Sequence, residues 1–220
     1  DAKLDVCVND LVDGAFFNSG QSCCGIERIY VEQSLYSQFV EAYVEQVKNY
    51  TLDNPLLAET TLGPMVRTSA ADWVRQQTSE ALAKGAQACI DPNLFANSRD
   101  NSPYLAPQVL LDVDHSMSVM REESFGPVVG IMSVKDDAEA IRLMNDSNFG
   151  LTASLWTQDA IRAELIADQI ETGTVFMNRA DYLDPALCWT GCKDTGRGGG
   201  LSVIGYHNLT RPKSYHLKKA

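Results

Sequence analysis

The chain has no apolar run near the roughly 18 residues that a membrane-spanning helix requires, and no hydrophobic signal-peptide region. It is also poor in basic residues, because 18 Lys and Arg stand against 29 Asp and Glu, a formal net charge of −11. Phosphate binding needs a basic face, so nucleic acid is not an expected partner. These absences predict a globular protein with neither a membrane span nor a nucleic-acid site.

Cysteine is sparse as well, with six residues in 220, too few for a disulfide scaffold, and no C-x-x-C pair occurs. Cys188 and Cys192 are four residues apart, but glycines follow them and no histidine is near, so we expect no metal site. Free thiols predict a reducing compartment, and we expect a cytoplasmic protein.

Apolar periodicity indicates the secondary structure. A helical period predicts helices, and short apolar runs predict strands. The expected helices are 1–14, 34–50, 68–84, 136–148 and 159–170, and the expected strands are 28–33, 86–91, 106–113, 151–157, 172–178 and the end of 122–135. Ser34 is the expected N-cap of the second helix, and Gly85 and Gly150 the expected stops of two others. Alternating strands and helices predict an α/β fold with a mostly parallel open sheet flanked by helices.

Two adjacent cysteines occupy the stretch "FFNSGQSCCGIER", residues 16–28, between Gly20 and Gly25. Glycines permit a tight backbone bend there. From these residues alone, the cysteines could be a nucleophile, a metal or disulfide pair, or ordinary core residues.

Three segments together resemble the aldehyde dehydrogenase family. They are the cysteine stretch, "REESFGPV" at 121–128, and "GTVFMN" at 173–178 followed by "WTGCKDTGRG" at 189–198. They span nearly the whole chain, in the family's order. The resemblance implies the family's catalytic domain and an NAD(P)-dependent aldehyde dehydrogenase activity.

The resemblance assigns chemistry to three residues. Cys23 matches the nucleophile, whose thiolate attacks an aldehyde to give a thiohemiacetal and, after hydride transfer, a thioester that water hydrolyses. Glu123 matches the glutamate that binds the nicotinamide ribose hydroxyls, and Phe125 the ring beside the nicotinamide. The implied cofactor is NAD or NADP.

The resemblance also implies a substrate pocket for an aldehyde that the sequence does not identify. Its expected residues flank the nucleophile or follow the strand 172–178: Ser22, Cys24, Asn178, Asp181, Leu183 and Trp189. Cys24 is more often a core cysteine. Asp181 and Asp184 could attract a cationic or hydroxylated substrate, or be solvated or cap backbone N–H groups.

We divide the chain into a thiol-containing catalytic domain, 1–200, and a C-terminal arm, 201–220. Alternation from Ser214 to Leu217 fits an oligomerisation strand, so we expect a homo-oligomer, dimer or tetramer. The resemblance places a Rossmann nucleotide-binding domain, the oxyanion-hole asparagine and the general-base glutamate before Asp1. We therefore expect this chain alone to be inactive.

One departure and three alternatives remain. Gly199-Gly200 stand where the family often has Arg-Glu, so a supporting proton relay is in doubt. A CoA-acylating aldehyde dehydrogenase would share the cysteine, and a non-catalytic relative would not need it. A cysteine hydrolase would need a histidine base, but the three histidines (115, 207 and 216) lie in no recognisable partner motif.

Overall fold

The computed structural model describes all 220 residues. Its α-helices are α1 (Leu4–Phe16), α2 (Tyr36–Val47), α3 (Thr68–Ala83), α4 (Asp137–Asn145), α5 (Ala160–Ala167) and α6 (Ser202–Leu209). Its strands are β1 (Arg28–Glu32), β2 (Gln87–Ala88), β3 (Gln108–Leu111), β4 (Val128–Val134), β5 (Phe149–Gly150), β6 (Thr152–Leu155), β7 (Thr174–Met177), β8 (Trp189–Thr190), β9 (Cys192–Lys193) and β10 (Gly199–Gly200). Three short 3₁₀ turns complete it: η1 (Phe17–Gly20), η2 (Pro92–Leu94) and η3 (Ser118–Met120).

The main sheet has four strands in the order β1-β4-β3-β2. The β1–β4 and β3–β4 pairs are parallel, as the alternation of strands and helices predicts. β2 departs from the expected parallel pairing and lies antiparallel to β3. The segment between β2 and β3 contains only η2, and a return without a crossover helix joins antiparallel neighbours.

Side chains alternate between the two faces of this sheet, and each face has its own core. Ile29, Val31 and Ile131 join the side chains of α1 and α2 in one cluster. Leu110 and Val128 join those of α3 and η3 in the other. Helices therefore cover both faces, which explains why the strands are apolar almost throughout.

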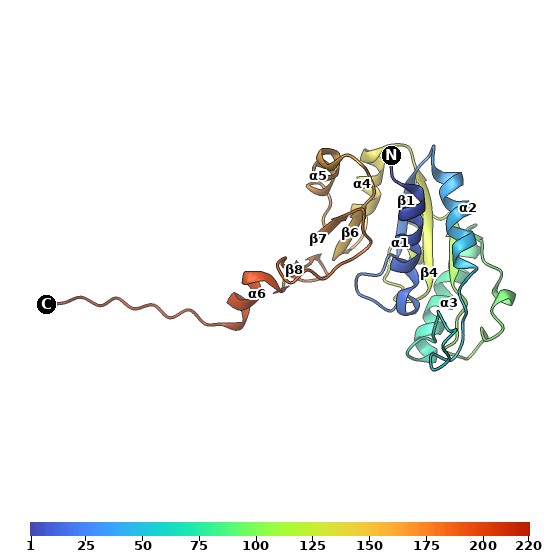
Figure 1. The fold of residues 1–220 in the computed structure, drawn as a ribbon, viewed down its shortest axis with the longest axis horizontal. Helices are drawn as coiled ribbons and strands as arrows, with labels where there is room; N and C mark the ends of the chain where they lie inside the picture. The colour runs from blue at the N-terminus through green and yellow to red at the C-terminus, as the bar shows by residue number, and fades with distance from the viewer.

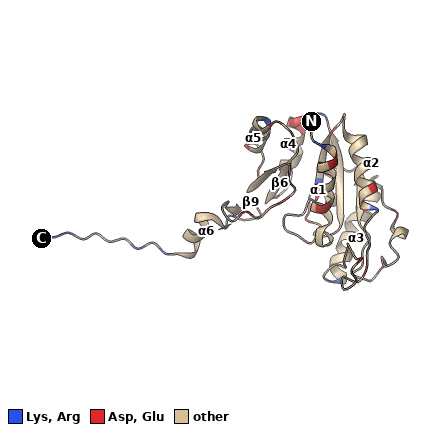
Figure 2. Cartoon of the chain, in the orientation of Figure 1, with Lys and Arg blue, Asp and Glu red and all other residues tan.

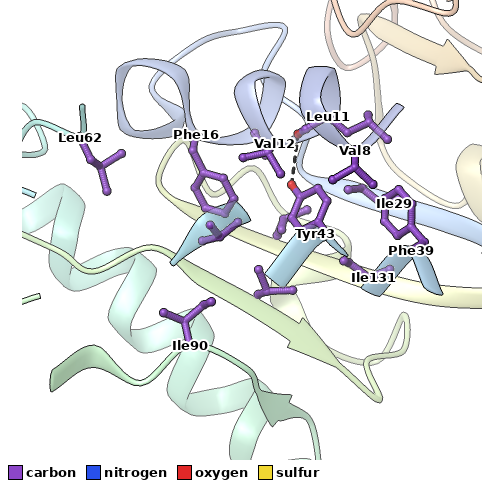
Figure 3. Packing of buried hydrophobic residues seen from close by; sticks show 14 of the residues in the cluster. Val8, Leu11, Val12, Phe16, Ile29, Phe39, Tyr43, Leu62, Ile90 and Ile131 are labelled. Atoms are coloured by element: carbon purple, nitrogen blue, oxygen red, sulfur yellow. Dashed lines mark hydrogen bonds between the residues drawn. The ribbon is translucent and has the colours of Figure 1, made fainter. Parts of the chain in front are cut away.

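The larger core contains a tyrosine that is fully buried. The Tyr43 ring from α2 packs on Phe39 and Phe16, and its hydroxyl donates to the Leu11 carbonyl of α1 at 3.1 Å (Figure 3). Burial raises the pKa of Tyr43 well above its ordinary value. This hydrogen bond satisfies a buried polar group and ties the two helices together.

A second unit stands beside the main sheet. Parallel strands β6 and β7, with α5, form a separate pair (Figure 1). A cavity of about 860 Å³ lies between the units, with all of β1 and all of β6 among its lining residues. Both strands have one neighbour only, so each presents an unpaired edge.

Two expected helix boundaries are wrong. Ser34 does not cap α2, which begins at Tyr36, because the Ser34 hydroxyl and N–H both donate to the Glu32 carboxylate. Gly150 does not end α4, which stops at Asn145; it lies in β5, where a side chain would collide with the Glu171 carbonyl. Gly85, with a positive φ of 106°, does follow the end of α3.

The C-terminal arm begins with α6, which the sequence analysis did not predict. Residues 211–220 then run away from the body as an exposed chain without ladder hydrogen bonds (Figure 1). The expected strand is thus not formed within a single chain, and its role between chains stays a prediction. No helix in the structure is both long and apolar enough to span a bilayer.

Candidate active site

The bend that presents the two cysteines follows directly from α1. After Phe16, three consecutive residues take positive φ angles: Asn18 at 50°, Ser19 at 58° and Gly20 at 72°. At Gly20 a side chain is also impossible, because a Cβ would lie 2.2 Å from the Gly126 carbonyl oxygen. The cysteine loop therefore touches the loop of the "REESFGPV" segment, backbone against backbone.

Polar side chains hold this bend against a third segment, 63–66. The Ser19 hydroxyl donates to the Gly63 carbonyl at 2.6 Å. The Gln21 amide oxygen accepts the Val66 N–H at 2.7 Å, while its nitrogen donates to the Asn18 carbonyl at 3.0 Å. Gln21 thus stabilises the loop rather than pointing to a ligand.

The two thiols differ sharply in environment. They lie in a turn closed by the Gly25 N–H on the Ser22 carbonyl at 3.1 Å. Cys23 is exposed, and its backbone N–H donates to no protein group. Cys24 is buried, and its Sγ lies 3.3 Å from both the Ser22 hydroxyl and an Asp181 carboxylate oxygen. Burial raises the pKa of Cys24 to about 11, so it stays a protonated thiol at neutral pH.

The loop carrying Glu123 and Phe125 is fixed by groups outside it. The Glu27 carboxylate accepts the N–H of Ser124 at 2.8 Å and of Phe125 at 3.0 Å. The Trp73 indole N–H donates to the Glu123 carbonyl at 3.1 Å. The Glu123 carboxylate itself makes no hydrogen bond or ion pair and is exposed, as is the Phe125 ring, at 39%.

The structure brings some of the expected residues together. Cys23 and Glu123 both line the large cavity, as does Glu122. The Asp181 carboxylate contacts the cysteine loop at the Cys24 thiol, and the Ser22 hydroxyl contacts the same thiol. These contacts join segments that are about 100 and 160 residues apart in the sequence.

The other expected pocket residues are placed differently. Both polar atoms of the Asn178 amide are committed to Thr157, accepting its N–H at 3.1 Å and donating to its carbonyl at 2.8 Å. Leu183 is 58% exposed, and Trp189 is half-buried in β8. None of the three lines the large cavity, so their part in a substrate pocket stays a prediction.

Sequence reasoning missed Glu27 and Trp73. The only signal for Glu27 is a carboxylate placed at the start of an apolar strand, next to Arg28, where charged residues need partners. Trp73 gives no signal, since an aromatic residue in an amphipathic helix is ordinarily a core residue. The structure contains no group of three or more side chains arranged to hold a metal ion.

Comparisons with known proteins place these features in a family. The model of the aldehyde dehydrogenase family matches residues 1–215. The chain is 35% identical over 209 residues to the succinate semialdehyde dehydrogenase [NAD(P)+] Sad of Escherichia coli K12, covering 95% of this chain and 45% of that protein. It is 35% identical over 214 residues to aspartate-semialdehyde dehydrogenase 1 of Pseudomonas canavaninivorans, covering 97% and 44%.

Solved structures agree with the sequence comparison. A lactaldehyde dehydrogenase superposes with a TM-score of 0.93 at 30% identity, covering all of this chain and 46% of that one. A betaine aldehyde dehydrogenase from Staphylococcus aureus, solved with NAD+, gives a TM-score of 0.87 at 30% identity, covering 94% and 42%. The chain spans a little under half the length of the relatives that it matches. With a family model matching almost its whole length, this chain belongs to the aldehyde dehydrogenase family.

Proposed function

We propose that this chain is the catalytic half of an enzyme that oxidises an aldehyde to a carboxylic acid with NAD or NADP. The observation that carries the proposal is the pairing of an exposed thiol, Cys23, with a free carboxylate, Glu123, on two loops in backbone contact. Relatives support it, since one is named for NAD(P)+ and another was solved with NAD+.

The chemistry starts at the Cys23 sulfur. Its thiolate adds to the aldehyde carbon, forming a C–S bond and an oxyanion that the free Cys23 N–H can receive. The C=O bond re-forms as the hydride leaves, which gives a thioester. Water then adds to the thioester, the C–S bond breaks, and a carboxylic acid and the thiol are released. Cys24 is held protonated, so it does not compete as nucleophile.

The residues present fit a nicotinamide dinucleotide. A carboxylate with no protein partner, as at Glu123, can accept both vicinal ribose hydroxyls, and the exposed Phe125 ring offers a flat apolar surface. When bound, the dinucleotide supplies the hydride acceptor. Glu123 and Phe125 would hold its nicotinamide end near Cys23, which fixes the direction in which the hydride leaves.

Three further parts of the proposal concern the whole protein. These 220 residues alone should not sustain oxidation, because a water-activating base and most of the dinucleotide contacts are not assigned to any residue here. All six cysteines are unpaired, which supports a reducing compartment such as the cytoplasm. The exposed arm supports assembly with a second copy.

The test uses the full-length polypeptide that carries these residues. We expect NADH or NADPH to form from a panel of aldehydes, and Cys23→Ser to abolish it by at least about 1,000-fold, as removal of a nucleophile does. The control is Cys89→Ser, a partly buried thiol outside the site, which should keep most of the activity. Peptide mapping after limiting iodoacetamide should find label at Cys23 first.

Two outcomes would contradict the proposal. Unimpaired turnover in Cys23→Ser would exclude this thiol as the nucleophile. Formation of an acyl-CoA in place of the free acid, when coenzyme A is added, would instead identify a CoA-acylating enzyme that uses the same cysteine.

A further inference from the structure

Glu27 occupies an unusual position for a carboxylate. It lies four residues after Cys23, directly before β1, and its carboxylate accepts N–H groups from the backbone of the Glu123 loop. One carboxylate oxygen accepts N–H groups of Ser124 at 3.1 Å and Phe125 at 3.0 Å, and the other accepts Ser124 at 2.8 Å. Two successive N–H groups thus converge on one anion, as in the backbone nests that bind anions.

The loop requires such support because its backbone is strained. Phe125 has a φ of 51°, in the left-handed region that a bulky residue avoids because it is strained there. Its side chain is 39% exposed, so packing holds it only in part. Such a conformation persists only when neighbouring groups over-determine it.

The carboxylate stays bound although it is taken out of water. Burial raises the pKa of Glu27, while the N–H groups of Phe125 and Ser124 oppose the shift by favouring the charged form. The nearby charges are of both signs, Glu123 raising the pKa and Arg28 lowering it. The buried carboxylate is therefore satisfied by the N–H groups of the loop that it contacts.

We propose that Glu27 is a positioning residue, which sets where the dinucleotide-binding loop 122–126 stands relative to the Cys23 thiol. The inference rests on the proposed function, in which Glu123 and Phe125 hold the nicotinamide end. Glu27 is the side-chain link, because it shares one short segment with Cys23 and binds the backbone between Glu123 and Phe125. The contact of Gly20 with Gly126 provides a second, backbone link.

The experiment is Glu27→Gln in the full-length polypeptide. A glutamine has one acceptor oxygen, and its NH₂ group would face an N–H donor, so at least one loop contact is lost. We expect hydride transfer to slow by up to about 100-fold, as a displacement near 1 Å can cause, and NAD(P)+ to bind measurably more weakly. Hydrogen exchange at the Ser124 and Phe125 amides should quicken, while the rate of iodoacetamide labelling at Cys23 stays within about twofold.

The matched control is Glu139→Gln. Glu139 also binds a backbone N–H through its carboxylate, that of Lys135 at 2.9 Å, but at the start of α4. It should leave NAD(P)+ binding unchanged. If Glu27→Gln lowers stability and yet binds NAD(P)+ like the wild type, Glu27 is merely structural and the inference is wrong.

A second variant separates the inference from the proposed function. Glu123→Gln removes the proposed ribose contact without touching Glu27. If Glu123→Gln binds NAD(P)+ normally, the assignment of Glu123 fails, whatever Glu27 does. If it weakens binding while Glu27→Gln does not, only the positioning role of Glu27 is overturned.

Discussion

Three polar side chains, Tyr30, His115 and Asp146, form a hydrogen-bonded chain from β1 to the end of α4. The Asp146 carboxylate lies 2.8 Å from the His115 Nδ1, and the His115 Nε2 lies 2.8 Å from the Tyr30 hydroxyl. The His115 side chain is only 10% exposed. Burial lowers the pKa of His115 below its ordinary 6.5, against the opposing effect of Asp146, and Arg28 adds to the lowering.

This histidine makes stability depend on pH. Since its pKa is lower in the folded protein than in the unfolded chain, folding favours the neutral imidazole. Its contribution is therefore complete above pH 6.5 and is lost as the pH falls from there through the folded pKa. The pKa of Asp146 is also lowered, so its contribution to stability is lost only below about pH 3.8. It therefore does not affect stability in the pH range where His115 titrates.

We expect the Tm to fall between pH 7.5 and pH 5, and to fall less in His115→Gln, which keeps polar atoms but does not titrate. Thermal unfolding at the two pH values measures this. His207→Gln, at an exposed position, is the control and should behave like the wild type. An equal drop in the wild type and in His115→Gln would show that other groups control acid stability.

Single residues differ in how far the sequence reveals them. Cys23, Glu123 and Phe125 could be singled out because each lies in a short motif whose spacing is itself the signal. Glu27 could not, because its partners are 97 and 98 residues away and no local pattern encodes that contact. Ser34 was assigned wrongly as a cap, because an adjacent acceptor, Glu32, competes for its hydroxyl.

Among the elements, α5 is a short helix that relies on its N-terminal cap. This eight-residue helix buries only Ala163, so packing contributes little. The Asp159 carboxylate caps it by accepting the N–H groups of Ile161 and Arg162, both at 3.0 Å. Short helices are marginal unless such end groups are satisfied.

Asp159→Ala should reduce the free energy of unfolding by about 1 kcal/mol, the usual value of an N-cap. The control is Asp168→Ala at the other end of α5, where a negative charge opposes the helix dipole, so its removal should be neutral or slightly stabilising. Urea midpoints of the two variants measure the difference. Identical midpoints would mean that α5 does not need its cap.

Element types could be predicted better than element partners. Apart from the expected strand of the C-terminal arm, each predicted helix and strand overlaps one in the structure, because the two hydrophobic periods are local properties. The antiparallel placement of β2 and the separation of β6–β7 from the main sheet depend on contacts between distant segments. The helix α6 escaped prediction because its apolar residues, Val203, Ile204, Tyr206 and Leu209, are spread around the helix and form no apolar stripe.

At the scale of the whole molecule, the end of the C-terminal arm is fully open to solvent. Residues 210–220 are all exposed, Tyr215 at 71% and Leu217 at 87%. These two apolar side chains alternate with Ser214 and His216, as in a strand with one face to bury. An exposed segment of this kind is suited to extending the sheet of a neighbouring copy.

Deletion of 211–220 should lower the oligomeric state of the full-length polypeptide, by about one step of assembly such as tetramer to dimer. Light scattering measures the mass. The double variant Tyr215→Ser with Leu217→Ser keeps the backbone and should weaken assembly without abolishing it. An unchanged mass after the deletion would show that the arm packs on its own subunit.

The end of the C-terminal arm also makes the charge distribution of the molecule asymmetric. Residues 211–220 hold four of the 18 basic residues and none of the 29 acidic ones, so a cationic filament extends from an anionic body (Figure 2). Opposite charges attract over roughly the 8–10 Å Debye length of physiological salt, and less as salt rises. In the proposed assembly, the arm of one copy would be drawn toward the body of another before any backbone contact forms, and ionic strength would set how fast the copies meet.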